Sequence, residues 1–430
     1  MLGHYHLETL IEISSGGVVG VAEVSSIFVA AGLNSPEVIA DPYPYYDRLR
    51  AASPVYGYAD LPPGTVPGQD EPNVSWAVLR YADVAEAARD PQTFSSTDPL
   101  QAASTAPTLM LVNDDPPRHS ALRAIAHKAF TPRRILDKGP WVAQAAAEIL
   151  APCGGRSFDF MTEVAPVLPA RVMAKVIGVD DAVVPRFRNW ATAFMLSADL
   201  TPADRESSNH EVAGFFADHV TRRYAQIDNG GEPPDDLVTA LIREESDGQH
   251  LSRDEVIRFC VTLLVAGAET TTFLLGNLAA TLLKHPELFG AVRADRSLIK
   301  PFIQETLRHS GPPQRLFRIA TRDTRLGSAD IKAGDWVALF YAAANHDPDV
   351  FEAPAEFRLN RPNANQQLTF GHGIHHCLGA GLARLEAECF LNALFDGFIA
   401  MEPGDGSPVR QTASLLNYGL DRCPVRLIPA

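Results

Sequence analysis

Apolar residues recur at helical spacing through most of the chain and alternate, as in strands, only in a few short stretches nearer its ends. The helical spacing predicts helices over 44–52, 82–90, 119–130, 142–150, 166–177, 184–196, 211–229, 237–245, 254–284, 299–309 and 378–395. The alternating stretches predict strands over Val55–Tyr58, 76–79, 319–326 and 336–340. This pattern predicts a mainly α protein of the α+β class, a single large helical domain with small β-sheets at its edge.

Two stretches do not fit this pattern. Residues 92–112 show no period, and a loop of that length inside a compact domain is usually functional or mobile. Residues 16–32 are apolar, but they include Glu23, follow no basic segment and are shorter than the ~20 residues that a membrane-spanning helix needs. We therefore expect no membrane anchor, an unanchored N-terminal extension over 1–40, and one domain over 41–430.

Composition and charge narrow the class of protein. The 430 residues are 46% hydrophobic and 21% charged, which is ordinary for a globular protein whose core is large enough to enclose a cofactor. The formal net charge of −15 argues against nucleic acid as a partner. The cysteine count is odd and includes no C-x-x-C pair, so we expect a reducing, cytoplasmic setting without a disulfide framework.

The stretch TFGHGIHHCLGAGLARLE, residues 369–386, places a single cysteine at the start of a helical pattern. Four interpretations compete for Cys377. It could be a buried structural cysteine, a nucleophile with His375 or His376 as its base, a zinc ligand, or a thiolate ligand to haem iron. A zinc site is disfavoured because the candidate ligands, among them His372, crowd into six residues of one loop and no second ligand pair occurs elsewhere.

The residues around the cysteine favour the haem interpretation. Gly371 and Gly373 allow a sharp turn close to a planar group. Gly379 and Gly381 keep the first helical turn free of side chains, so that a macrocycle can approach. The cysteine lies at or just before a helix N-terminus, where free N–H groups lower the pKa of a thiol and hydrogen-bond to a ligating sulfur. An apolar stripe supports this placement, with members at Leu378, Leu382 and Leu385.

This segment also resembles a known family. It is similar to the ten-residue haem-binding signature of the cytochrome P450 family, with matches at Phe370, Gly371, Gly373, His375, Cys377 and Gly379. The resemblance implies that Cys377 is the axial ligand to the iron of haem b (iron protoporphyrin IX) and that Phe370 packs beside the sulfur. It also implies that His375 reaches a haem propionate and that Gly371 and Gly379 belong to the cofactor-binding loop. The variable positions His372 and His376 are expected to be structural.

The predicted helix over 254–284 carries the second part of the resemblance. It is apolar nearly all round, as in a buried core helix, yet Gly267, Glu269 and Thr270 interrupt its middle. The threonines fit either a core helix with hydroxyl groups bonded to i−4 carbonyls or a groove for oxygen activation. The run Ala266-Gly267-x-Glu269-Thr270 resembles the family's acid–alcohol motif. The resemblance implies that Ala266 and Gly267 border the haem, that Thr270 holds a hydrogen-bond network and that Glu269 feeds protons into it.

Further charged residues match family positions. Glu305 and Arg308 stand at i, i+3 on one predicted helix and resemble the ExxR pair, and Arg361 matches the arginine that completes its triad. The resemblance implies a structural role for these three, a buried network that anchors the cysteine loop. Cations in separate segments match positions for propionate contact, together with His375: His119, Arg123 and Arg318.

The resemblance covers residues 41–429 and implies a haem-dependent monooxygenase. Such an enzyme takes O2, two electrons and two protons and inserts one oxygen atom into an apolar small organic substrate. The chain has no G-x-G-x-x-G after a strand, so NAD(P)H electrons are expected to arrive through a ferredoxin and its ferredoxin reductase. Basic residues that could receive an acidic partner are Arg118, Lys128, Arg133, Arg134 and Arg384. Apolar residues in segments that resemble substrate-contacting regions are Leu109, Met110, Phe194, Met195, Val265, Leu316, Phe317 and Leu415.

Two other functions remain open on the sequence. The alternative enzyme is a haem-thiolate peroxygenase or peroxide-rearranging enzyme, which needs no external electrons. The alternative outside enzymology is a haem-binding sensor or a relative without activity. The intact pair Glu269-Thr270 argues against both, because neither needs to protonate dioxygen.

Overall fold

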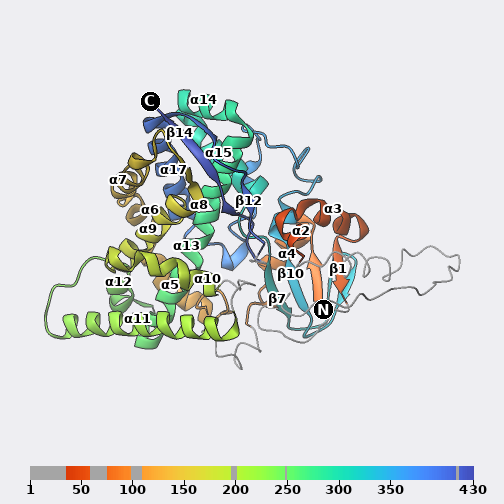
Figure 1. Ribbon diagram of the computed structural model, residues 1–430. Helices are drawn as coiled ribbons and strands as arrows, with labels where there is room; N and C mark the ends of the chain where they lie inside the picture. Colours follow the sequence, from red (N-terminus) through yellow and green to blue (C-terminus); the bar gives the residue numbers. More distant parts are fainter. Residues whose placement is uncertain (1–34, 59–74, 98–108, 195–200, 247–248, 413–415) are drawn as a thin grey trace, which may run out of the picture.

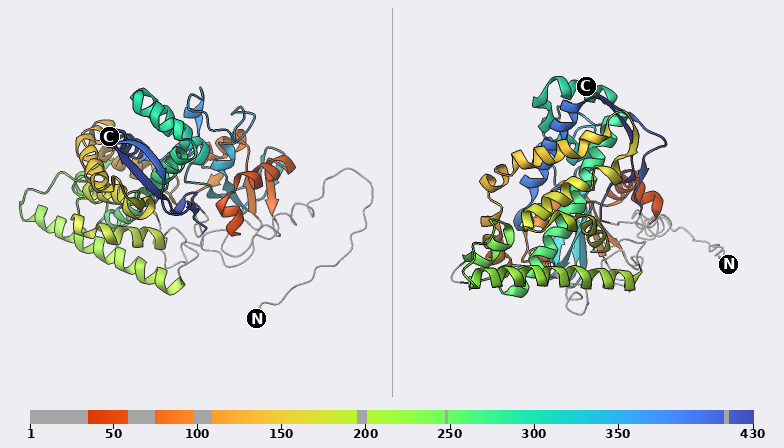
Figure 2. Two further views of the ribbon diagram at one scale, coloured as in Figure 1. Left: turned by 45° about the horizontal axis from the view of Figure 1, so that its top comes forward. Right: turned by 60° about the vertical axis from the view of Figure 1, so that its left-hand side comes forward.

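The computed structural model describes residues 35–58, 75–97, 109–194, 201–246, 249–412 and 416–430. A large helical part occupies one side of the molecule, and a smaller part with a sheet of five described strands occupies the other (Figure 1). The long helix α13 (Arg253–Lys284) runs through the helical part, and α11 (Pro202–Asp228) lies across one end of it (Figure 2). This is the mainly helical α+β arrangement that the sequence predicts.

The helical part is built from helices whose apolar faces share one large core around α13. Its other helices are α5 (Arg118–Ala129), α6 (Pro132–Leu136), α7 (Gly139–Leu150), α8 (Phe160–Glu163), α9 (Val167–Ile177), α10 (Val184–Phe194), α12 (Leu237–Arg243), α14 (Pro286–Ala294), α15 (Ile299–Ser310) and α17 (Ala380–Gly397). Helices of the sheet-bearing part are α2 (Pro36–Ala40), α3 (Tyr43–Ala52), α4 (Tyr81–Arg89) and α16 (Tyr341–Ala344). Short 3-10 helices are η2 (Ala151–Cys153), η3 (Asp181–Val183), η4 (Arg296–Leu298), η5 (Ala364–Gln366) and η6 (Gly373–His375).

The larger sheet has the strand order β1-β2-β10-β7-β3. Its strands are β1 (Val55–Tyr58), β2 (Ser75–Val78), β10 (Trp336–Leu339), β7 (Leu316–Ala320) and β3 (Phe94–Ser95). Strand β10 pairs in parallel with β2, and the other pairs are antiparallel. Because Ser95 pairs with Ile319, the residue after β3 comes to lie beside Arg318 of β7.

The smaller sheets lie elsewhere in the fold. One contains β11 (Phe398–Pro403), β14 (Pro424–Pro429) and β4 (Ser157–Asp159). The two-stranded sheets pair β12 (Val409–Arg410) with β13 (Leu420–Arg422), β5 (Glu245–Ser246) with β6 (Gln249–His250), and β8 (Thr324–Leu326) with β9 (Ala329–Ile331). Because β14 joins β11 to β4, the C-terminal strand ties the end of α17 to the segment that follows α7.

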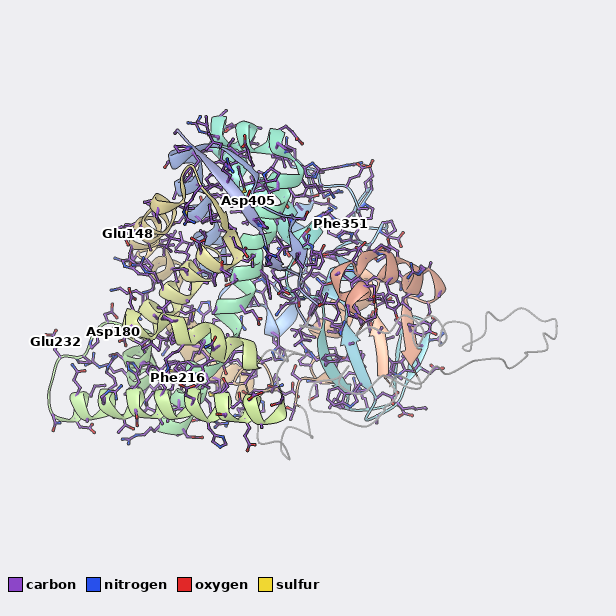
Figure 3. The ribbon with its side chains drawn as sticks, viewed as in Figure 1. Glu148, Asp180, Phe216, Glu232, Phe351 and Asp405 are labelled. Atoms are coloured by element: carbon purple, nitrogen blue, oxygen red, sulfur yellow. The ribbon has the colours of Figure 1, made fainter. Side chains whose placement is uncertain are left out.

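Helix α13 has a well-defined start and a buried middle. Ser252 accepts a hydrogen bond from the backbone N–H of Glu255 at 3.3 Å, and the Glu255 carboxylate accepts one from the backbone N–H of Ser252 at 2.8 Å, which is a capping box. Among the described residues α13 has the length and composition of a membrane span, but 67% of its most apolar window is buried inside the protein. Helices α9, α10, α11 and α15 pack around it. Phe216 of α11 (Figure 3) packs on Phe187 of α10, with ring centroids 6.5 Å apart.

The structure corrects several predicted elements. The stretch 319–326 forms two strands, β7 and β8, because the polar residues 321–323 turn the chain between them. Helix α11 begins at Pro202, well before the predicted start at 211, because Thr201 caps it. Helix α17 begins at Ala380 rather than 378. The sequence did not predict α14, β4, β11 or β14. Residues 1–34, most of the irregular stretch and the predicted end of the 184–196 helix lie outside the described residues, and the division into 1–40 and 41–430 stays a prediction.

Glu386 of α17 is a buried carboxyl group, and the described residues give its Oε2 no hydrogen-bond partner. Burial raises the pKa of Glu386 from 4.5 to about 8. The folded state therefore keeps a proton that the unfolded state loses above pH 4.5, so this group lowers the free energy of unfolding as pH rises from 4.5 to 8. We expect Glu386→Gln to stabilise the protein by roughly 1–3 kcal/mol near pH 8 and by much less at pH 5.

Urea unfolding at the two pH values measures this effect. Glu388→Gln is the matched control, because Glu388 lies on the same helix but is partly exposed and pairs with Lys300 at 3.7 Å. A gain from Glu386→Gln that is equal at both pH values would contradict a buried, protonated carboxyl group.

Candidate functional site

A tight loop carries Cys377 to the start of α17. The backbone N–H of Cys377 donates to the carbonyl of Phe370 at 2.7 Å and so closes the loop. Gly371 and Gly373 have φ angles of 73° and 68°, in the left-handed region that glycine adopts without strain. A Cβ at Gly373 would lie 2.3 Å from the carbonyl oxygen of Ala88 in α4. The sharp turn expected of the two glycines is present, and Gly373 in addition lets the loop pack directly on α4.

The Cys377 side chain has accessible surface although protein atoms surround it. A ligand can therefore reach the thiol, although neighbouring protein atoms desolvate it. The N–H groups of Gly379 and Ala380 favour the thiolate, but burial outweighs them and raises the pKa of the Cys377 thiol. The predicted lowering of this pKa is therefore wrong for the protein without a metal, because desolvation outweighs the helix N-terminus. A metal that binds the sulfur displaces the proton itself.

Basic side chains from separate elements gather beside the cysteine loop. His119 and Arg123 come from α5, Arg318 comes from β7, and His375 lies in η6 of the loop itself. The rings of His119 and His375 lie 4.5 Å apart. Burial is the main cause that lowers the pKa of both histidines, and Arg318 lowers them further; the pKa of His375 falls to about 3. The fold thus concentrates groups of like charge, which favours an anion between them.

This basic cluster has hydrogen-bond donors available for an anion. Arg123 donates to the carbonyl of His376 at 2.5 Å and Arg318 to that of Phe317 at 2.6 Å, and neither forms an ion pair with a described residue. His119 Nε2 is buried, and the described part of the chain gives it no hydrogen-bond partner. Arginine and histidine donors suit carboxylates. The predicted propionate-binding residues are therefore brought together. The donors of His119, Arg123 and Arg318 fit the carboxylates of a haem, whereas both ring nitrogens of His375 already lie within hydrogen-bond distance of other groups of the protein.

The middle of α13 also borders accessible space. Ala266 is exposed and Thr270, one turn later, is half-buried, although most of the helix around them is buried. The Thr270 hydroxyl donates to the Ala266 carbonyl at 2.7 Å, the back-bond expected of a core helix. Its oxygen can still accept a hydrogen bond from the accessible side. Glu269 is half-buried next to it. The core-helix pattern and the groove predicted for Thr270 are thus compatible.

Glu305 holds two arginines in a buried network. Arg308, on the same helix α15, donates to the Glu305 carboxylate through Nε at 2.9 Å and Nη2 at 2.8 Å. Arg361 donates to the same carboxylate through Nε at 2.9 Å. All three side chains are buried. The structure therefore brings the predicted pair and its third member together.

This network reaches the cysteine loop through Asn345. Arg308 Nη1 donates to the Asn345 carbonyl at 3.0 Å. The Asn345 amide accepts from the backbone N–H of Leu368 at 2.6 Å and donates to Thr369 Oγ at 2.9 Å. Thr369 directly precedes Phe370, so a continuous chain of hydrogen bonds joins the buried ion network to the loop that carries the cysteine.

Two predicted glycines pack against neighbouring helices. A Cβ at Gly267 would lie 2.7 Å from Met173 Sδ of α9, and a Cβ at Gly381 would lie 3.2 Å from Ile135 Cδ1 of α6. The Ile135 side chain of α6 borders the space at Gly381, and the expectation that Gly381 leaves room for a macrocycle stays a prediction. The contact with Met173 accounts for Gly267, whose role beside the haem stays a prediction. Gly379 is different, since a Cβ there would lie 3.9 Å from the Cys377 sulfur.

The sequence did not identify the groups that hold His375. Its Nδ1 lies 3.0 Å from the carbonyl oxygen of Leu111, and its Nε2 lies 2.9 Å from the hydroxyl of Ser96. Both residues belong to the stretch 92–112, whose missing period indicated a functional loop without showing which residues act. In the same stretch Met110 donates its backbone N–H to Thr262 Oγ of α13 at 2.9 Å. The loop is thus attached to both the cysteine loop and the long helix.

The structure describes only some of the residues predicted to contact the substrate. Met110 and Val265 are buried, and Leu316 and Phe317 are half-buried in β7. Met195, Leu415 and the side chain of Phe194 lie outside the described residues. His372, expected to be structural, accepts a hydrogen bond from Arg89 Nε at 2.6 Å.

A helix-rich fold, a glycine-rich cysteine loop and a basic cluster fitted to carboxylates define the class of haem proteins with a cysteine ligand. A sequence profile of the cytochrome P450 family matches residues 169–417. The chain is 34% identical to the putative cytochrome P450 YjiB of Bacillus subtilis, over 90% of this chain and 94% of that protein. It is 36% identical to the cyclomarin C epoxidase CymV of Salinispora arenicola, over 76% of this chain and 84% of that protein.

A solved structure agrees with these sequence relatives. Cytochrome P450 CYP109Q5 of Chondromyces apiculatus superposes with a TM-score of 0.80 at 31% identity, covering 93% of this chain and 98% of that chain. The chain belongs to the cytochrome P450 family. It is a haem-dependent P450 monooxygenase, as the resemblance implied.

Proposed function

We propose that this monooxygenase inserts one atom of O2 into an apolar small molecule, while the other atom leaves as water. The observation that carries the proposal is the Cys377 sulfur, accessible within the protein and held beside the basic cluster. Haem, when bound, supplies the activation of O2. The apolar residues expected on the substrate side, among them Val265 and Leu316, favour an apolar substrate and exclude water.

Each predicted site residue then has a definite task. Cys377 donates its thiolate to the iron, and Phe370 packs beside that sulfur. The carboxylates of the cofactor are bound by the basic cluster, and the backbone of the loop and of α13 borders its ring. The residues of the basic cluster are His119, Arg123, Arg318 and His375; those that border the ring are Ala266, Gly267, Gly371 and Gly379. Glu305, with Arg308 and Arg361, anchors the loop through Asn345.

Thr270 and Glu269 handle protons in this proposal. The Thr270 hydroxyl donates to the Ala266 carbonyl, so its oxygen lone pair is the part left to order water on the accessible side. Glu269, which directly precedes Thr270 on α13, supplies protons to that water. The pair therefore delivers protons at the point where the oxygen–oxygen bond must break.

Electrons come from NAD(P)H through a ferredoxin reductase and a ferredoxin in the cytoplasm. The sequence supports this step because no dinucleotide-binding motif is recognised in the chain. Arg118, Lys128 and Arg134 already pair with acidic residues, whereas Arg133 is exposed on α6. The surface around α6 and α17 is thus the side on which we expect an acidic partner to bind.

Thr270→Ala tests the proton assignment. We expect haem content and spectrum to be retained and product per electron to fall several-fold, with the missing electrons recovered as hydrogen peroxide. Thr272→Ala is the matched control, since Thr272 makes the same back-bond, to Ala268 at 2.8 Å, two positions further along α13. Unchanged product per electron in Thr270→Ala would refute the assignment. Equal turnover with hydrogen peroxide alone would instead identify a peroxygenase.

A further inference from the structure

Arg384 lies two turns beyond Cys377, on α17, and the described residues supply no carboxylate for its charge. Its guanidinium carbon lies 4.4 Å from the centroid of the Phe370 ring. Its Nη1 donates to the Ala380 carbonyl at the long distance of 3.4 Å, and its Nε is buried without a hydrogen-bond partner among the described residues. A half-buried guanidinium without an anion is unfavourable, so another group must offset its charge.

The group placed to do so is the sulfur of Cys377. Phe370, whose ring the guanidinium covers, accepts a hydrogen bond from the backbone N–H of Cys377 at 2.7 Å. The positive charge of Arg384 acts to lower the pKa of the Cys377 thiol, against the larger effect of burial. A metal-bound thiolate carries a negative charge that a thiol lacks, so the attraction is realised once the sulfur is a ligand. Arg123 is attracted to the same sulfur, but it donates to the His376 carbonyl and belongs to the basic cluster. Among the described residues, Arg384 has only the long hydrogen bond to the Ala380 carbonyl and the contact with the Phe370 ring.

We propose that Arg384 is a positioning residue for the axial sulfur, whose guanidinium keeps the Phe370 ring in place and holds a positive charge near the ligand. This inference rests on the proposed role of Cys377. Reduction adds negative charge to the iron–thiolate unit, so a nearby cation favours the reduced state. Arg384 therefore raises the midpoint potential, independently of any partner that docks on the same side.

The experiment compares haem-loaded variants without a redox partner. Arg384→Gln and Arg384→Met remove the charge, and Arg384→Lys keeps the charge without the planar stack. Arg133→Gln is the matched control: it removes an exposed cation from α6, which packs on α17 through Ile135. The measurements are the midpoint potential by spectroelectrochemical titration and the spectrum of the reduced protein with carbon monoxide.

We expect both neutral variants to keep the thiolate-type carbon monoxide spectrum. At a fixed solution potential, the ratio of reduced to oxidised protein in these variants should fall about tenfold. This corresponds to a midpoint potential about 59 mV lower for one electron. Arg384→Lys should shift much less, and Arg133→Gln should match the wild type. Haem loss from both neutral variants, with retention in Arg384→Lys, would support the same charge-based role.

Two results overturn the inference. One is a potential of the neutral variants equal to that of Arg133→Gln. The other is a potential of Arg384→Lys as low as that of Arg384→Gln, because the charge would then not be the cause. Failure of the underlying role of Cys377 is distinguishable, since the wild-type protein itself would lack the thiolate-type spectrum before any variant is compared.

Discussion

We expect Cys377→Ser to lose haem, with at least a tenfold drop in haem and iron per protein and no thiolate-type spectrum with carbon monoxide. A serine hydroxyl is a poor donor to iron, whereas a thiolate binds it strongly and donates charge to it. The burial that raises the pKa of the Cys377 thiol keeps it neutral without a metal, so the substitution removes no charge from the folded protein. The haem-free variant should therefore unfold within about 1 kcal/mol of the haem-free wild type.

The matched control for this variant is Cys389→Ser. Cys389 is a half-buried cysteine on the same helix, and its sulfur donates only weakly, to the Gly139 carbonyl at 3.8 Å. It should keep haem and spectrum. Cys377→Ser protein with full haem content would refute the ligand assignment, as would a folded wild-type protein that is colourless and free of iron when purified from haem-replete cells.

The site could be predicted from the sequence where short motifs fix residues close together in the chain. The cysteine loop is such a case, because its glycines and its cysteine act within a single turn. The triad is a second, since Glu305 and Arg308 stand at i, i+3 on one helix and Arg361 followed from the resemblance. The gathering of His119, Arg318 and His375 was expected only from the family match, because those residues come from separate elements.

Contacts across the fold escaped prediction because no local pattern encodes them. Glycine at positions 267 and 381 suggested open space beside the helices. The side chains of Met173 and Ile135, from other helices, lie against these two positions. The thiol of Cys377 shows the same limit for energetics. The helix N-terminus, which lowers the pKa of this thiol, is visible in the sequence. The burial that raises the pKa by a larger amount depends on packing. Sequence patterns thus indicated which groups act, and the fold decided which effect dominates.

Glu305→Gln should destabilise the protein by about 3–5 kcal/mol, the cost of leaving buried charges without their partner. The change keeps the size of the side chain but removes the negative charge that Arg308 and Arg361 share. All three groups are buried, so water cannot replace the carboxylate. A loss of this size is a large part of the ~5–15 kcal/mol that keeps a domain folded, so poor expression and haem loss should accompany it. Chemical unfolding at constant haem content measures the change.

The matched control is Glu356→Gln, since Glu356 is exposed and pairs with Arg358 at 2.8 Å on the surface. That variant should change stability by less than about 1 kcal/mol. If Glu305→Gln does not fold, Arg361→Gln tests the same network. Arg308 alone then balances the Glu305 carboxylate, so the loss of stability should be smaller but still measurable. Arg308 also donates to the carbonyl of Asn345, and the Asn345 side chain donates to Thr369 of the cysteine loop. Weakening the triad should therefore loosen the cysteine loop before the sheet-bearing part unfolds. Stability of Glu305→Gln equal to that of Glu356→Gln would show that the network does not anchor the loop.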